Sequence, residues 1–209
     1  MAADAMATDT DSDSDDGAPA LSTSLGEAAD MAAVQGTAAL GAAIATAREV
    51  DDGTPWLSLD GANIGFAHGP VVPGGGGRSR FSAPGILLAY GWFARRGLGS
   101  RVKAFLPAGL GRRHAELQPL LDVGALVLVP SPEDDDTWIL TYAVANGGFV
   151  VSNDRFRDHT ERLGDDSLPR FLAARQLTYA FAGNEFMPSP ATALALTSRG
   201  WNLQEMDVG

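Results

Sequence analysis

Five short apolar runs alternate along the chain with longer segments that begin at proline or end at glycine. Continuous apolar runs of this length are typical of strands that are covered on both faces. Proline at the start and glycine at the end of a segment are helix-boundary signals. We therefore predict an α/β fold, a three-layer sandwich with a mostly parallel central sheet of about five strands. The predicted strands are 56–60, 102–106, 125–129, 148–152 and 177–181, and the predicted helices are 84–96, 112–123, 132–146 and 167–175.

The composition divides the chain around this α/β core, which we expect to occupy residues 53–190. Residues 1–24 are rich in Asp, Ala, Ser and Thr, and such a segment buries too little apolar surface to fold, so we expect a disordered acidic tail. Residues 25–52 form an Ala-rich helical segment and linker that is too polar for a membrane span. A C-terminal tail is expected at 191–209. Because no secretory signal pattern is found, we expect a cytoplasmic or nuclear protein that is not secreted and does not bind a membrane.

The formal net charge of -11 is unevenly distributed. Residues 1–52 carry 11 acidic side chains and one basic one, which leaves 15 acids and 14 bases for the rest. Residues 61–115 hold eight bases and no acid, so this half is a candidate surface for a polyanion. Solvated charges at helix ends and in loops are the alternative. The candidate phosphate contacts are Arg78, Arg80, Arg112 and Arg113.

The chain contains no cysteine, which excludes disulfides, cysteine nucleophiles and zinc fingers within it. Any metal must therefore bind to oxygen atoms or to histidine. The histidines His68, His114 and His159 are interpreted as surface or loop residues and not as catalysts.

Carboxylates follow two of the predicted strands. Asp60 ends the run 56–60, and Asp154 follows the run 148–152. Because the carboxyl ends of parallel strands meet at one edge of a sheet, we expect both side chains there. Asp158 comes four residues after Asp154, so one helical turn would place both on one side. An Asp before glycine is also a common turn residue, which is the alternative for Asp60.

A third carboxylate, Asp136, is expected near the start of the predicted helix 132–146. It shares a helical face with apolar residues three, four and seven positions later, the face that should pack on the sheet. Glu133 and Asp134 are explained as acids that face the positive N-terminus of this helix, with Ser131 as its cap and Pro132 at its first position. Clustered carboxylates repel one another unless a cation lies between them, and hard oxygen ligands favour Mg²⁺ or Mn²⁺. The sequence therefore predicts a divalent-metal site suited to phosphodiester hydrolysis.

The motifs around these carboxylates resemble those of a known family. They are Leu59-Asp60-Gly61-Ala62-Asn63, His68-Gly69, Gly85-Ile86-Leu87-Leu88-Ala89 with Trp92-Phe93, Asp135-Asp136, Val150-Val151-Ser152-Asn153-Asp154 with Arg157-Asp158, and Phe186-Met187-Pro188. In this order and spacing they resemble the ribonuclease domain of the Regnase family, in the NYN branch of the PIN-like nucleases. The resemblance covers about residues 55 to 190.

The resemblance implies a PIN-like fold and an endoribonuclease that cleaves single-stranded or loop RNA by attack of metal-activated water. It implies that Mg²⁺, or Mn²⁺, is held by the aspartates Asp60, Asp136, Asp154 and Asp158, with Asn63 and Asp135 in support. Ser152 and Asn153 are further candidates for contact with the RNA.

The chain also departs from the family that it resembles. Many members carry a CCCH zinc finger, which the lack of cysteine excludes from this chain. The short acidic segment 131–134 replaces a longer basic loop, and Pro84 stands where a basic residue often precedes the Gly-Ile-Leu-Leu run. We expect these departures to affect binding of the RNA substrate more than binding of the metal. The alternatives are an RNA-binding module without catalysis and a nuclease that acts on DNA or structured flaps, and the sequence is compatible with a homo-oligomer.

Overall fold

The computed structural model describes residues 55–74, 76–77, 79–130 and 134–198. The predicted acidic tail, the Ala-rich helical segment, Arg78 and most of the predicted C-terminal tail lie outside the described residues. The predictions made for them are not tested by the structure.

A parallel sheet of five strands forms the middle layer of the domain, and its strand order is β3-β2-β1-β4-β5. Each neighbouring pair in this sheet is parallel, which confirms the predicted fold. The central strand β1 carries the motif that ends in Asp60. The strands are β1 (Leu57–Asp60), β2 (Val102–Pro107), β3 (Leu126–Val129), β4 (Phe149–Val151) and β5 (Gln176–Leu177).

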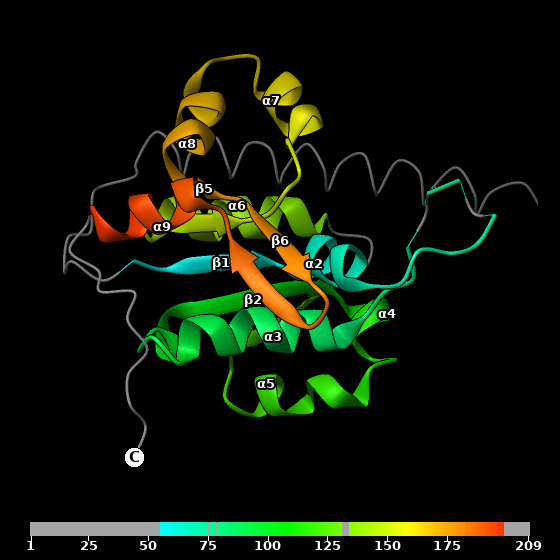
Figure 1. Cartoon of the computed structure of the whole chain (residues 1–209). Coiled ribbons are helices and arrows are strands. Elements are labelled where there is room, and N and C mark those ends of the chain that lie inside the picture. The colour runs from blue at the N-terminus through cyan, green and yellow to red at the C-terminus, as the bar shows by residue number, and fades with distance from the viewer. Residues whose placement is uncertain (1–54, 75, 78, 131–133, 199–209) are drawn as a thin grey trace, which may run out of the picture.

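Helices cover both faces of this sheet. Figure 1 shows α3 and α5 on one side and α6, α7 and α8 on the other, so the domain has three layers. The helices are α2 (Gly61–His68), α3 (Ala83–Ala94), α4 (Ala108–Gly111), α5 (Gln118–Asp122), α6 (Asp135–Ala145), α7 (Arg157–Leu163), α8 (Ser167–Arg175) and α9 (Pro190–Thr197), with short 3₁₀ turns at Gly99–Arg101 (η1) and Ala115–Leu117 (η2).

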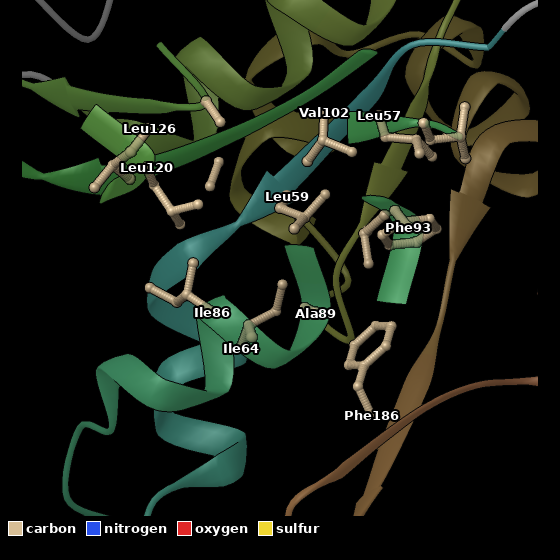
Figure 2. Packing of buried hydrophobic residues seen from close by; sticks show 14 of the residues in the cluster. Leu57, Leu59, Ile64, Ile86, Ala89, Phe93, Val102, Leu120, Leu126 and Phe186 are labelled. Carbon is tan, nitrogen blue, oxygen red and sulfur yellow. The ribbon is translucent and has the colours of Figure 1, made fainter. Parts of the chain in front are cut away.

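Two hydrophobic cores hold the layers together, one on each face of the sheet. Leu57 and Leu59 of β1 pack with Phe93 of α3 in the first core (Figure 2). Val150 of β4 packs with Ile139 of α6 in the second core. All five side chains are almost fully buried, and burial of each contributes on the order of 1.5–3 kcal/mol. The carboxyl edge of the sheet is thereby held on a rigid platform.

No helix was predicted directly after Asp60, yet helix α2 begins at Gly61. A Cβ atom at this position would lie 2.6 Å from the carbonyl oxygen of Phe105. Only glycine therefore lets the helix start so close to β2. Glycine has a low helix propensity, which explains why the pattern did not indicate a helix here.

The helix predicted at 112–123 is also wrong in detail. The segment holds only the residues just after α4, the turn η2 and the short helix α5, which has proline in its first turn. At Gly111 a Cβ atom would lie 2.4 Å from Cδ2 of Leu128. The end of α4 therefore packs closely against the side chain of Leu128 in β3.

The strand predicted at 177–181 divides between two sheets. Its first residue, Leu177, ends β5, whereas β6 (Tyr179–Ala182) leaves the main sheet and pairs antiparallel with β7 (Glu185–Pro188). The hairpin turns at Gly183, whose φ of 59° favours glycine. This division brings Tyr179 to the edge where Asp60 lies.

Helix α9 follows the hairpin and lies partly in the segment predicted as a C-terminal tail. Ser189 caps it by accepting the Thr192 N–H at 3.3 Å, and Leu196 is fully buried. In the described part of the chain, no helix is both long and apolar enough to cross a membrane.

Candidate active site

The carboxylate of Asp60 lies at the carboxyl end of the central strand and is only 3% exposed. Its Oδ1 accepts the backbone N–H of Asn63 at 2.9 Å, which makes it the N-cap of α2. Its Oδ2 accepts the hydroxyl hydrogen of Ser152 at 2.7 Å. Burial, together with smaller effects of the charges of Asp135 and Asp154, raises the pKa of Asp60 to about 6 despite these hydrogen bonds. A simple turn residue would be solvated and would keep its ordinary pKa.

Asn63 connects α2 to the loop after β4 and to the hairpin. Its Oδ1 accepts the N–H of Asn153 at 3.0 Å and the O–H of Tyr179 at 2.6 Å. The side chain of Asn153 pairs with the backbone of Tyr179 in both directions, each bond being 3.1 Å long. Because both donors use Oδ1 of Asn63, its Nδ2 group points away from them. Three segments that are distant in sequence thus fix one amide group.

Asp154 lies in the loop after β4. Its Oδ1 accepts the N–H of Phe156 at 2.7 Å, and its own N–H donates to Ser152 Oγ at 3.0 Å. Phe156 has a φ of 50°, a left-handed conformation that costs a bulky residue roughly 1–2 kcal/mol. Helix α7 begins only at Arg157, so the prediction that Asp154 and Asp158 share one helical turn is wrong. Both carboxylates nevertheless line the same cavity.

Asp134 is the N-cap of α6, because its Oδ1 accepts the backbone N–H of Asp136 at 3.1 Å. The prediction placed Asp134 inside the first turn of a helix that begins at residue 132, so the helix begins later than predicted. Its Oδ2 lies 3.0 Å from Nε2 of His159 and 3.4 Å from Nη1 of Arg162. The hydrogen bond from His159 is the main reason why the pKa of Asp134 is lowered. His159 is 3% exposed and also lies 3.1 Å from Oγ1 of Thr137. The interpretation of His159 as a surface or loop residue is therefore wrong.

Asp135 and Asp136 occupy the first turn of α6 and have no basic partner within hydrogen-bonding distance among the residues that the structure describes. Burial raises the pKa of Asp136 to about 7, and the charges of Asp60, Asp135 and Asp134 add to the effect. Burial also raises the pKa of Asp135. The helix N-terminus alone would stabilise their negative charge, so burial and the neighbouring carboxylates outweigh it at both residues.

A cavity of about 570 Å³ opens where these elements meet. Asp60 and Asp135 are not among its lining residues. Its acidic lining is Asp134, Asp136, Asp154 and Asp158. The remaining polar lining is Asn63, Asn153, Arg155, Arg157, His159 and Arg162.

The donor atoms at this edge suit a hard divalent cation. Asp134, Asp135 and Asp136 each offer one carboxylate oxygen, and these three oxygens lie within 4.8 Å of one another. Asp60 contributes a further carboxylate whose charge raises the pKa of Asp136. Oxygen donors and mutual repulsion are the properties that Mg²⁺ and Mn²⁺ sites show without the ion. The residues present therefore fit such an ion.

The residues predicted to contact RNA fall into two groups. Arg80, Arg112 and Arg113 are exposed on loops beside the carboxyl edge, where the ring of His114 lies 4.8 Å from that of Phe81. Ser152 and Asn153 bond instead within the protein, to Asp60 and to the backbone of Tyr179 as described above. These bonds give them a role in building the site, and direct contact with RNA stays a prediction.

Several site residues were missed from the sequence. Tyr179 and His159 carry no motif of their own, and only their tertiary contacts show that they belong to the site. Arg155 and Arg157 could have been found, because they lie between Asp154 and Asp158 in the loop already singled out. Their position in the cavity wall adds positive charge next to the acidic cluster.

A parallel α/β sandwich with carboxylates gathered at the carboxyl edge of its sheet is the arrangement expected of a PIN-like domain. A family model, that of the Zc3h12a-like ribonuclease NYN domain, matches residues 57–195. The chain belongs to this family, which confirms the resemblance found in its motifs. It is therefore a ribonuclease-type domain.

Solved structures support the same fold. Two structures of the nuclear protein-only RNase P 2 (PRORP2) of Arabidopsis thaliana are similar to the chain. The first has a TM-score of 0.56 at 18% identity and matches 79% of this chain and 36% of that chain. The second has a TM-score of 0.57 at 20% identity and matches 90% and 39%. The chain thus spans well under half the length of these proteins, and the likeness shows the fold alone.

Proposed function

We propose that the chain is a metal-dependent endoribonuclease that hydrolyses phosphodiester bonds in single-stranded or loop RNA. The observation that carries this proposal is the gathering of carboxylates at one edge of the sheet: Asp136 and Asp154 line the acidic cavity, and Ser152 connects Asp60 to the loop of Asp154. Burial also raises the pKa of Asp60 and Asp136. A domain keeps unneutralised carboxylates together at a cost in stability, and a bound cation offsets that cost. Membership of a ribonuclease family supports RNA as the substrate.

Asp60 and Asp136 are assigned as the principal ligands of Mg²⁺ or Mn²⁺. Asp154 and Asp158 complete the site directly or through water, and Asp135 adds negative charge behind it. Asp134 is already paired with His159 and Arg162, so it orients the start of α6. A divalent ion held in this way lowers the pKa of water and offsets negative charge on a phosphate group.

The side chain of Asn63 orients the RNA phosphate. Its Oδ1 already accepts two hydrogen bonds, and the residue lines the cavity. Its Nδ2 group is therefore the donor that remains for a phosphate oxygen. Arg80, Arg112 and Arg113 contact phosphates further along the RNA, because exposed arginines at this edge attract a polyanion. Arg78 lies outside the described residues, and its contact with a phosphate stays a prediction from the sequence.

The test uses circular single-stranded RNA and circular single-stranded DNA of the same sequence, each with Mg²⁺, Mn²⁺ or EDTA. A circle has no ends, so only an endonuclease can open it. We expect the RNA circle to be opened with either metal and to stay closed in EDTA. Binding of RNA without cleavage would favour the non-catalytic module, and equal cleavage of the DNA circle would favour a nuclease that does not select RNA.

A further inference from the structure

A second cavity of about 450 Å³ lies beside the candidate active site. Helix α8 forms one wall with Pro169, Leu172 and Ala173, and α7 contributes Thr160 and Glu161. Gln176 lies at the start of β5 and completes the lining on the side of the sheet. The assignments made above for the acidic cavity use none of these side chains.

Two arginines are shared between the cavities. Arg155 and Arg157 line both the acidic cavity and the second one. Phe156 lies between them in the sequence, and its ring is buried in the core under α6 while both arginines are exposed. The left-handed conformation of Phe156 turns the chain here and keeps the two guanidinium groups at the surface. They form a positively charged boundary between the two cavities, which can bind the phosphates of an RNA strand that passes from one cavity to the other.

The second cavity has the chemistry of a nucleobase site. Its α8 wall is apolar, which suits the face of a base, whereas Thr160, Glu161 and Gln176 present polar atoms for a base edge. Thr160 Oγ1 already donates to the carbonyl of Phe156 at 3.1 Å, so its oxygen remains as an acceptor. RNA-binding sites read single-stranded bases in this way, by contact with the face and hydrogen bonds to the edge.

Gln176 connects this cavity to the loop that carries Asp154. Its Nε2 donates to the carbonyl of Ser152 at 2.8 Å and to the carbonyl of Asp154 at 2.5 Å. Both hydrogens of the amide group are therefore used inside the protein, and Oε1 is the atom left for a ligand. A base that contacts Gln176 would therefore touch the residue that holds the loop of Asp154 in place.

We propose that the second cavity binds the base of a nucleotide next to the scissile phosphate of single-stranded RNA, and that Arg155 and Arg157 hold the phosphate between the two sites. The proposal rests on the endoribonuclease function proposed above and adds a subsite to it. Charge complementarity with the arginine boundary and continuity with the acidic cavity identify RNA as the occupant.

The test compares two substitutions on α8 with a set of RNAs. Ala173→Leu places a larger side chain in the second cavity, whereas Ala174→Leu changes an equally exposed neighbour that does not line it. Both variants should melt like wild type, because leucine suits an exposed helix position. The RNAs are short single strands in which one base-free nucleotide is moved along the sequence. The readout is kcat/KM with Mn²⁺ for each combination.

For the wild type and Ala174→Leu, we expect one base-free position next to the cleavage site to lower kcat/KM about tenfold, within the range for one base contact. Ala173→Leu should lower kcat/KM for the intact RNA by a similar factor and show no further loss at that position, because the two changes remove the same contact. An equal loss from base removal in both variants would overturn the subsite and leave the nuclease function standing. If the wild type cut none of the RNAs, the proposed function itself would fail, and the subsite with it.

Discussion

The phenolic O–H of Tyr179 donates a 2.6 Å hydrogen bond to Oδ1 of Asn63 and so joins the hairpin strand β6 to the first turn of α2. Burial raises the pKa of the Tyr179 phenol, and the charge of Asp60 adds to the rise. The hydroxyl therefore stays protonated at neutral pH and acts as a donor there. Through it, the hairpin controls the orientation of an amide in the candidate active site.

Replacement of this donor tests the role of the hairpin. Tyr179→Phe keeps the ring and removes one of the two hydrogen bonds to Asn63, so the free energy of unfolding should fall by only about 1 kcal/mol. Because Asn63 can then rotate, we expect kcat for RNA cleavage to fall by more than KM changes. The matched control is Tyr90→Phe on α3, whose hydroxyl lies near Gly99 at the opposite edge of the sheet. Equal kcat values for the two variants would contradict the positioning role.

The buried contact between His159 and Asp134 should stabilise the start of α6. His159→Leu leaves the half-buried Asp134 carboxylate with Arg162 as its basic partner, and we expect the free energy of unfolding at pH 7 to fall by about 1–3 kcal/mol. The control is His114→Leu, because His114 pairs with Glu116 on the surface at 3.1 Å and such pairs contribute about 0–1 kcal/mol. Urea unfolding measures both. A larger loss for the control would show that the buried pair is unimportant.

Without metal, the stability of the domain should depend on pH through Asp136. Its pKa is raised from 3.8 to about 7 in the folded protein, so between these values the folded state binds more protons than the unfolded state. Stability must then fall as the pH rises from about 4 to about 7. For Asp136→Asn this loss is absent. In EDTA at pH 8 the variant should therefore be more stable than the wild type, by on the order of 3 kcal/mol.

The same variant separates a metal site from a capping role. At pH 4 the two proteins should be almost equally stable, because Asp136 is then protonated in the folded wild type. Adding Mn²⁺ at pH 8 should stabilise the wild type and have little effect on Asp136→Asn. If Asp136 only stabilised the helix N-terminus, its loss would cost about 0.3–1 kcal/mol at pH 8, and Mn²⁺ would shift both proteins alike. Urea titrations at the two pH values decide between these roles.

The sheet could be predicted because its strands are short, continuous apolar runs. β1, β2, β3 and β4 begin and end within one residue of the predicted ranges. The elements that depend on close packing could not be predicted. Helix α2 begins at Gly61, where the carbonyl of Phe105 leaves no room for a Cβ atom. Leu177 and Tyr179 lie in different sheets although only one residue separates them.

The candidate site could be predicted only where a carboxylate follows a strand or begins a helix. Asp60 and Asp136 were found by this rule, and the structure shows that the charge of one raises the pKa of the other. Tyr179 and His159 belong to the site through contacts over 116 and 22 residues of sequence. No local pattern encodes such contacts, since a tyrosine in a hairpin and a histidine in a helix are ordinary residues of those elements.

The central claim, that unneutralised carboxylates at the edge of the sheet hold a catalytic metal, is tested most directly by titrating Mn²⁺ into a cleavage reaction. The substrate is a labelled single-stranded RNA, and wild type, Asp60→Asn and Asp136→Asn are compared at pH 8. We predict that cleavage by the wild type rises from zero in EDTA to a plateau, and that both variants stay at least a hundredfold slower at every Mn²⁺ concentration, on the order of the effect of removing one essential catalytic group. Cleavage by the wild type in EDTA, or wild-type rates in both variants, would contradict the claim.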